Sequence, residues 1–213
     1  MSQQELADQK QALVQLLSTT DRGRRVSDAQ QQAITQQVAW LEAHNPTPIP
    51  TAATDALDGN WLTLFTTSRD LLRLAKGLPF VTTGEIYQAI RVETQQVFNV
   101  AEIQGSGGLV SLVPQGVFAV AATFAVVSEQ RVEVTFQRFF LGNSFFMNYQ
   151  IDSFLDLLQY QPDRIAALKI DIQSRPQKGW LDITYLDQDL RIGRGSEGSL
   201  FILEKVHCPS KDP

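Results

Sequence analysis

The stretch Gly179-Trp-Leu-Asp-Ile-Thr-Tyr-Leu-Asp-Gln-Asp-Leu-Arg-Ile-Gly-Arg-Gly-Ser-Glu-Gly-Ser-Leu-Phe-Ile-Leu-Glu-Lys205 decides the fold of this chain. Apolar and polar residues nearly alternate over 180–186, which predicts a strand with one buried face. The acidic segment 187–189 and the glycine-bearing segment 193–198 predict two tight reversals, and the apolar run 200–203 predicts a third strand. Consecutive strands joined by short turns are typical of antiparallel barrels and sandwiches.

The same stretch contains Gly193-Arg-Gly195-Ser-Glu-Gly198, which matches the G-x-G-x-x-G spacing of dinucleotide-binding loops. That loop cradles a pyrophosphate where a strand opens into a helix. Here a strand-like run follows instead of a helix. The glycines are therefore expected to form a hairpin turn, where they can adopt positive φ values.

Composition describes a soluble globular protein. The chain has 213 residues, of which 43% are hydrophobic and 19% charged, and length predicts one main domain with an appendage. A net charge of −5 does not favour binding to nucleic acid. The single cysteine, Cys208, excludes an internal disulfide. No apolar run reaches the roughly 20 residues of a membrane span, and the first residues lack the layout of a signal peptide.

Motifs that carry catalysis are missing from the sequence. The two histidines, His44 and His207, lack metal-ligand spacing to a second ligand, and neither G-x-S-x-G nor H-E-x-x-H occurs. We therefore expect no enzyme activity, no cofactor and no metal site.

The first 50 residues predict a helical hairpin. One helix is expected over 3–17 and a second after Ser27, which forms a capping-box pattern with Gln30. The proline-rich segment 45–50 cannot continue a helix and predicts a stiff spacer. The chain is accordingly divided into a hairpin and linker over 1–50 and a barrel over 51–213.

After the prolines the hydrophobic period changes from 3.6 to 2. Strands are expected over 57–66, 84–92, 96–104, 109–113, 116–127 and 131–138, in addition to the final three. The almost wholly apolar run 116–127 is either buried on both faces or lines an apolar cavity, and we favour the cavity wall. Eight or nine strands make a barrel whose interior holds side chains or one small ligand. The expected fold is mainly β (α+β), an antiparallel barrel preceded by the helical hairpin.

Large apolar residues of these strands are candidates for the lining of a lipid cavity. The candidates are Tyr87, Phe98, Phe118, Phe124, Val134 and Phe136.

The segment 139–147 concentrates phenylalanines around Gly142-Asn143. If the side chains are exposed at the barrel mouth, they form an apolar patch that marks lipid or partner contact; if they fold inward, they cap the core. The membrane-docking candidates are Phe139, Phe140, Phe145, Phe146 and Met147. A short helix is expected over 153–160.

Four strings in order carry a family resemblance. They are Arg22-Gly23, Leu41-Glu42 with Asn45-Pro46, Leu57-Asp58-Gly59-Asn60-Trp61, and Tyr185-Leu-Asp-Gln-Asp-Leu-Arg-Ile-Gly-Arg-Gly195 with Leu200-Phe201. Together they resemble the plastid lipid-associated protein or fibrillin family over nearly the whole chain. The resemblance implies a lipocalin-like barrel, a photoprotective or structural role at thylakoids or lipid globules, and contact with carotenoids, prenylquinones or acyl lipids. It implies no catalytic site.

The resemblance also marks structural positions. These are Gly59, Trp61, Asp187, Arg191, Arg194 and Gly195. In lipocalin-like barrels an arginine from the last strands packs across the tryptophan of the Gly-x-Trp signature, and either Arg191 or Arg194 is the candidate here. Trp61 is expected to plug the closed end of the barrel rather than contact ligand. Asp187 and Asp189 are expected to form a turn rather than a catalytic carboxylate pair.

Two expectations depend on context. Plant members of the family carry a transit peptide that this sequence lacks, so a cyanobacterial protein at the cytoplasmic side of the thylakoid is expected, or a trimmed plant protein of the plastid stroma or plastoglobule. The alternative to a lipid carrier is a scaffold with a filled barrel that binds a partner protein, such as an isoprenoid-pathway enzyme.

Overall fold

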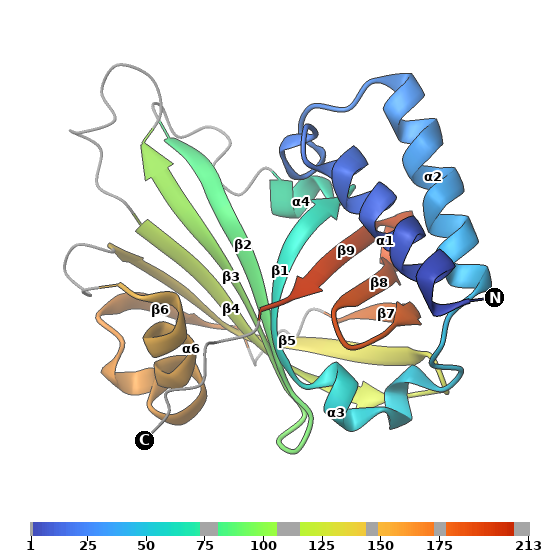
Figure 1. Ribbon diagram of the computed structural model, residues 1–213. Coiled ribbons are helices and arrows are strands. Elements are labelled where there is room, and N and C mark those ends of the chain that lie inside the picture. The colour runs from blue at the N-terminus through green and yellow to red at the C-terminus, as the bar shows by residue number, and fades with distance from the viewer. Residues whose placement is uncertain (1, 73–80, 106–115, 144–148, 173–177, 207–213) are drawn as a thin grey trace, which may run out of the picture.

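The structure is a computed structural model that describes residues 2–72, 81–105, 116–143, 149–172 and 178–206. Its centre is an antiparallel sheet whose strand order is β4-β3-β2-β1-β9-β8-β7-β5-β6, closed into a barrel by pairing of β4 with β5. The strands are β1 (Gly59–Thr66), β2 (Val81–Arg91), β3 (Gln96–Gly105), β4 (Gly116–Val126), β5 (Arg131–Asn143), β6 (Ala167–Asp171), β7 (Lys178–Leu186), β8 (Leu190–Gly195) and β9 (Leu200–Lys205). Eight strands form the ring, and β6 pairs with the end of β5 outside it (Figure 1). The expected mainly β, lipocalin-like barrel behind a helical hairpin is confirmed.

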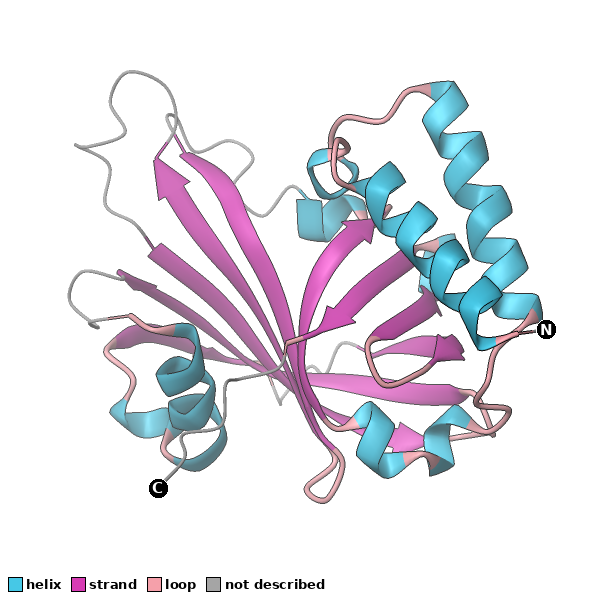
Figure 2. Cartoon of the chain, in the orientation of Figure 1, coloured by secondary structure: helices cyan, strands magenta, loops and turns pink. Residues whose placement is uncertain are grey.

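The helical hairpin consists of α1 (Gln3–Leu17) and α2 (Asp28–Ala43). Ser27 and Gln30 form the expected capping box at the start of α2. The apolar face of α2, with Ile34 and Leu41 fully buried, packs together with α1 on outward-facing residues of β7, β8 and β9 (Figure 2). The hairpin therefore shares a hydrophobic core with one side of the barrel.

The tip of the hairpin is fixed to β1 by close backbone contact. Gly23 has φ 102°, and a Cβ at this position would lie 2.2 Å from the Thr66 carbonyl oxygen. No other residue type fits there, because both the conformation and the approach exclude a side chain. Arg22 pairs with Glu85 and Arg24 with Asp21, so this part of the loop is salt-bridged.

The proline-rich segment is tied to the barrel by hydrogen bonds. The Asn45 side-chain oxygen accepts from the Leu186 backbone N–H at 3.0 Å, and the Thr47 hydroxyl donates to the Leu186 carbonyl at 2.6 Å. Two short helices follow, η2 (Pro50–Ala52) and α3 (Thr54–Leu57). Another short helix, α4 (Arg69–Leu72), follows β1.

One end of the barrel is filled by side chains. Trp61 is fully buried there, and its indole N–H donates to the Leu57 carbonyl of α3 at 3.0 Å. Ile90, Phe124 and Leu186 complete the packing around it. This agrees with Trp61 as a structural plug.

The helix α6 (Ile151–Tyr160) covers the outer face of the β2–β5 half of the barrel, and a 3-10 turn, η4 (Pro162–Arg164), leads from it to β6. Phe154, Leu155 and Leu158 are the buried residues of α6, and Ile165 packs beside them. The sheet is therefore apolar on both faces here, against the cavity inside and against α6 outside. Figure 1 shows α6 lying beside this half of the barrel.

The structure corrects the predicted role of the glycines in the stretch 179–205. Gly193 and Gly195 lie in β8, and only Gly198 in the short turn η5 (Ser196–Gly198) has positive φ, at 71°. A Cβ on Gly193 would lie 3.1 Å from the Leu181 side chain, and one on Gly195 would lie 3.0 Å from the Phe201 ring. These two glycines make room for neighbours rather than for a turn. The chain continues into β9, which is the wrong context for a dinucleotide loop.

The observed strands differ in two details from the expected ones. The first strand begins at Gly59, because Leu57 ends α3. The strand β6 was not predicted. The strand expected over 109–113 lies outside the described residues.

Candidate ligand-binding cavity

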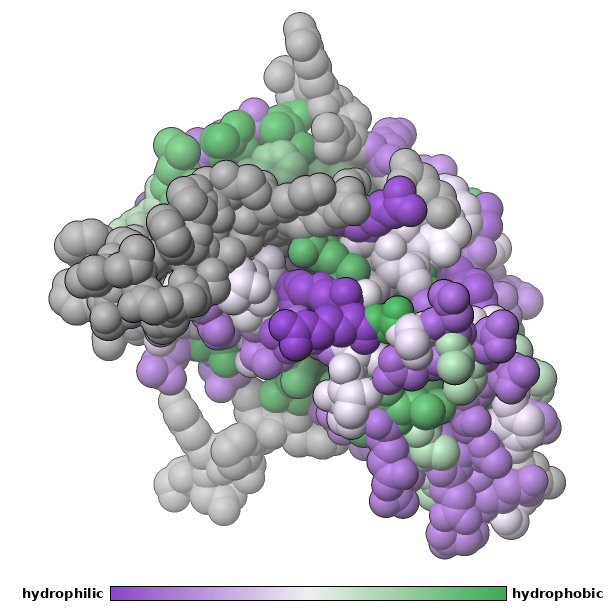
Figure 3. Space-filling view, turned by 90° about the horizontal axis from the view of Figure 1, so that it is seen from above, coloured by the Kyte–Doolittle hydropathy of each residue, from purple (hydrophilic) through white to green (hydrophobic). Residues whose placement is uncertain are grey.

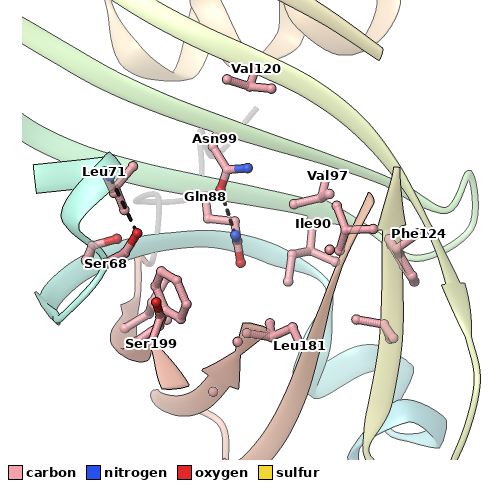
Figure 4. Close-up of a pocket in the computed structure, with 18 of the residues that line it drawn as sticks. Ser68, Leu71, Gln88, Ile90, Val97, Asn99, Val120, Phe124, Leu181 and Ser199 are labelled. Carbon is pink, nitrogen blue, oxygen red and sulfur yellow. Dashed lines mark hydrogen bonds between the residues drawn. The ribbon is translucent and has the colours of Figure 1, made fainter. Parts of the chain in front are cut away.

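The barrel encloses a cavity of about 410 Å³ beside its filled end (Figure 4). This volume falls at the lower end of the roughly 300–1,000 Å³ found for small-molecule pockets. Its wall is mostly aliphatic and aromatic, and Ile90, Val97 and Leu181 point into it together with a few polar groups. Such a cavity can hold an apolar molecule that makes few polar contacts.

Four of the six predicted lining residues face this cavity. They are Phe118 and Phe124 of β4 and Val134 and Phe136 of β5. Part of the run 116–127 is thus a cavity wall, as favoured, and Val117 and Ala119 on its other face are buried in the cluster with α6.

The expectation for Tyr87 and Phe98 is wrong. Side chains alternate along a strand, and on β2 the cavity is lined by Ile86 and Gln88, so that Tyr87 points outward. Phe98 likewise packs outside, with the α6 cluster, while its neighbour Val97 lines the cavity. Both strands carry apolar residues on both faces, and the sequence therefore left the inner face undefined.

The docking candidates on β5 also need correction. Phe140 is 1% exposed and packs under α6, so it is not a surface residue. Phe139 lines the cavity and stacks on Phe118 with ring centroids 5.7 Å apart. Phe145, Phe146 and Met147 lie outside the described residues.

The exposed apolar residues of this region lie next to Phe139 instead. Leu141 pairs with Leu168, and Phe139 pairs with Ile170, across β5 and β6. Opposite residues of a pair point to the same face, so Leu141, Leu168 and Ile170 extend the face that Phe139 presents to the cavity. Their exposed fractions are 49%, 62% and 51%. We call these three residues the β6 apolar strip.

Polarity is unevenly spread over the surface. Seen from above, polar residues dominate the side that carries the N-terminal helices, and hydrophobic residues gather at the opposite edge (Figure 3).

Inside the cavity, three polar side chains form a chain of hydrogen bonds. The Arg191 guanidinium donates through Nη2 to Gln88 Oε1, and Gln88 Nε2 donates to Asn99 Oδ1 at 2.7 Å (Figure 4). The guanidinium carbon also lies 4.8 Å from the centre of the Trp61 ring. The sequence left open whether Arg191 or Arg194 packs on Trp61, and the structure identifies Arg191.

Arg191 is a buried cation that has no carboxylate partner among the described residues. It is 1% exposed, and its Nε and Nη1 atoms have no hydrogen-bond partner among the described residues. Burial lowers the pKa of Arg191 to about 9, so the side chain stays protonated at neutral pH. Lys205, whose Nζ lies 5.3 Å from the Trp61 ring centre, is a second cation close by. Burial, together with repulsion from Arg191, lowers the pKa of Lys205.

Arg194 and Asp187 have structural partners outside the cavity. Arg194 donates two hydrogen bonds to the Glu42 carboxylate of α2, at 2.7 and 2.8 Å. Asp187 accepts from the backbone N–H groups of Asp189 and Leu190 and pairs with Lys10 at 2.7 Å. Asp187 is thus a turn-forming and helix-anchoring residue. Burial alone would raise its pKa, but hydrogen bonds from Lys10, Tyr185 and these backbone groups lower it.

Metal-binding clusters and membrane-spanning helices are both absent from the described residues. Within them, no group of three or more histidine, cysteine, aspartate or glutamate residues is arranged to hold a metal ion. Nor is any described helix long and apolar enough to cross a membrane.

The fold and cavity define a lipocalin-like barrel, and comparison with known proteins gives its family. The PAP_fibrillin family model matches residues 7–204, and the chain belongs to this family. It is 34% identical to the chromoplast-specific carotenoid-associated protein of Cucumis sativus, over 92% of this chain and 67% of that protein. It is 32% identical to plastoglobulin-1 of Pisum sativum, over 92% of this chain and 60% of that protein. For the plastid-lipid-associated protein of Citrus unshiu the identity is 31%, over 96% and 70%. No solved structure matches significantly.

Proposed function

We propose that this protein is a non-catalytic lipid-binding protein that holds one apolar molecule in its barrel. The observation that carries the proposal is the cavity of about 410 Å³ walled by Phe118, Phe124, Val134 and Phe136. Each methylene group transferred from water into such a wall contributes about 0.8 kcal/mol, so an acyl or prenyl chain would bind through burial alone. The cavity also favours this function over a filled-barrel scaffold.

The relatives support the same class of ligand. Their names describe proteins associated with carotenoids, plastoglobules and plastid lipids. By this likeness we propose that the chain works at the thylakoid surface or at lipid globules, in a photoprotective or structural role. A carotenoid, a prenylquinone or an acyl lipid is the proposed type of ligand.

Retinol, a neutral isoprenoid whose fluorescence rises in apolar surroundings, tests the cavity. We expect wild-type protein to bind it one to one. Val134→Trp should abolish binding, because the indole would fill the cavity that Val134 lines. The matched control is Val126→Trp, at a position that is 52% exposed, and it should bind as wild type does. Equal binding by both variants would place the probe outside the barrel and contradict the proposal.

We further propose that the β6 apolar strip is the surface that docks on lipid. The strip lies on the sheet face that Phe139 presents to the cavity. A lipid layer that covered the strip would therefore lie next to the cavity. No acidic residue belongs to the strip, and the ligand would pass from one apolar environment to another. This strip replaces Phe139 and Phe140 as the docking candidates among the described residues.

Flotation with vesicles of phosphatidylcholine and phosphatidylglycerol tests the docking surface. The triple variant Leu141→Ser, Leu168→Ser and Ile170→Ser should lose vesicle binding while retaining retinol. Val126→Ser with Val127→Ser is the control, since these residues are 52% and 56% exposed at the β4–β5 turn. If the control loses vesicle binding and the triple variant keeps it, the docking surface has been misplaced.

A further inference from the structure

Arg191 is the one arginine in the described part of the cavity wall, and its surroundings differ from those of a structural ion pair. Among the described residues, the wall contains no aspartate or glutamate, and its two cations are Arg191 and the exposed Lys178. An isolated charge at 1% exposure is unfavourable unless something accepts its hydrogen bonds. Stacking on Trp61 offsets part of this cost but accepts no hydrogen bond.

The nitrogen atoms of Arg191 that have no hydrogen-bond partner among the described residues can only donate hydrogen bonds. Nη2 is used by Gln88, whereas Nε and Nη1 are unused among the described residues. Gln88 in turn donates to Asn99 Oδ1, and this orients the Asn99 amide so that its own N–H groups remain as donors at the cavity wall (Figure 4). The polar part of the cavity thus has a positive charge in its wall, with the N–H groups of Asn99 as donors beside it.

Such an arrangement selects an acceptor, and most strongly an anionic one. A carboxylate accepts two hydrogen bonds from one guanidinium and neutralises its charge. A hydroxyl group can accept but brings no charge, and a hydrocarbon can do neither.

We propose that Arg191, supported by Gln88 and Asn99, anchors the carboxylate head group of a single-chain lipid acid whose tail lies in the apolar part of the cavity. The inference rests on the proposed function, since it assigns the head group of the ligand held in the same cavity. It gives Arg191 a role in binding in addition to its packing on Trp61, and it separates lipid acids from carotenoid hydrocarbons and neutral prenyl alcohols.

Retinoic acid and retinol test this directly, because they share one tail and differ in the head group. We expect wild-type protein to bind the acid about ten- to a hundredfold more tightly than the alcohol, the range of a hydrogen bond to a charged group. Arg191→Met should remove this preference while leaving retinol affinity within about twofold.

Gln88→Glu is a second variant that keeps the arginine. The new carboxylate would lie where Gln88 Oε1 accepts from Arg191, and it would occupy the guanidinium and repel an acid. We expect it to lose the preference for retinoic acid and to remain folded. Arg194→Met is the matched control on the same strand, because that side chain pairs with Glu42 outside the cavity. It should keep the full preference.

The outcomes separate the two proposals. Binding of neither ligand by wild type would contradict the proposed function. Equal binding of acid and alcohol, or an acid preference that survives in Arg191→Met, would overturn the role of Arg191 and leave the apolar cavity intact. Loss of the preference in Lys178→Met instead of Arg191→Met would place the head group at the exposed lysine, against the proposal.

Discussion

Strand β8 carries an arginine on each face, and the two side chains have opposite surroundings. Arg194, on the outside, is 44% exposed and makes two hydrogen bonds to Glu42 of α2. Arg191, on the inside, is 1% exposed, and its one hydrogen-bond partner within the described ranges is the neutral amide of Gln88. Outside, opposite charges join the helical hairpin to the barrel. Inside, an uncompensated charge faces a space that can hold a molecule.

Packing shows the same contrast. On the outer face Tyr185, Ile192 and Ile202 are fully buried against the helices. On the inner face Leu181 and Ile183 line the cavity. One side of the sheet is a solid core, and the other is partly hollow.

The largest expected effect on the free energy of unfolding comes from truncating a leucine on the outer face of the barrel, compared with a leucine on its inner face. Leu41→Ala deletes a fully buried contact between the hairpin and the barrel and should lower the free energy of unfolding by about 2–5 kcal/mol. Leu181→Ala removes a side chain that already borders empty space, so it should cost about half as much or less. Urea unfolding of both variants measures the difference. Equal losses would mean that the inner face is packed as tightly as the outer one.

The two arginines should respond with opposite signs in ligand-free protein. Arg191→Met removes two unsatisfied buried donors, each of which costs about 1–3 kcal/mol. It also loses the hydrogen bond to Gln88, worth about 1.5–3 kcal/mol, and the cation–π attraction to Trp61, worth about 0.5–2 kcal/mol. A net gain in unfolding free energy near 1 kcal/mol is expected. Arg194→Met breaks a partly exposed pair and should lose about 0.2–1 kcal/mol. If Arg191→Met proved the more destabilising change, the charge would be needed by the fold itself.

A further effect, whose pH dependence is confined to acid pH, concerns the outer turn at Asp187. Its folded-state pKa lies below the unfolded value of about 3.9, so its stabilising contribution is present above that value. The contribution is lost as pH falls through the lowered pKa. Asp187→Asn should therefore cost about 1 kcal/mol at pH 7 and flatten the acid side of the stability profile. Asp163→Asn, with a side chain 89% exposed, should leave the profile unchanged. A steep acid limb that persists in Asp187→Asn would assign it to other groups.

The sequence predicted those parts of the fold that local patterns determine. The capping box at Ser27 and the spacing of Ile34, Val38 and Leu41 are properties of one helix, and α2 has them. Alternation over 131–138 and 180–186 placed two strands of the barrel. The strand β6 was missed because Leu168 and Ile170 are exposed, so no buried face marks it in the sequence.

The candidate site was predicted less completely, because it depends on which face of each strand turns inward. In Ile86-Tyr87 and Val97-Phe98, adjacent apolar residues serve opposite faces. Size favours the larger residue of each pair, Tyr87 and Phe98, as the lining, but both pack outside the barrel with the α6 cluster. Phe139 and Phe140 divide in the same way.

Arg191 and Arg194 could not be separated from sequence either. Both lie in β8, and the three-residue spacing says that they point to opposite faces without saying which is inside. The partners that decide this, Trp61 and Glu42, come from segments more than a hundred residues away.

Native mass spectrometry of protein isolated without detergent from its own cells tests whether the barrel holds a lipid. A barrel with a working apolar cavity should carry one small lipid per chain, and Val134→Trp isolated in the same way should carry none. Wild-type protein that is consistently empty, or a Val134→Trp variant that carries the same molecule, would contradict the account.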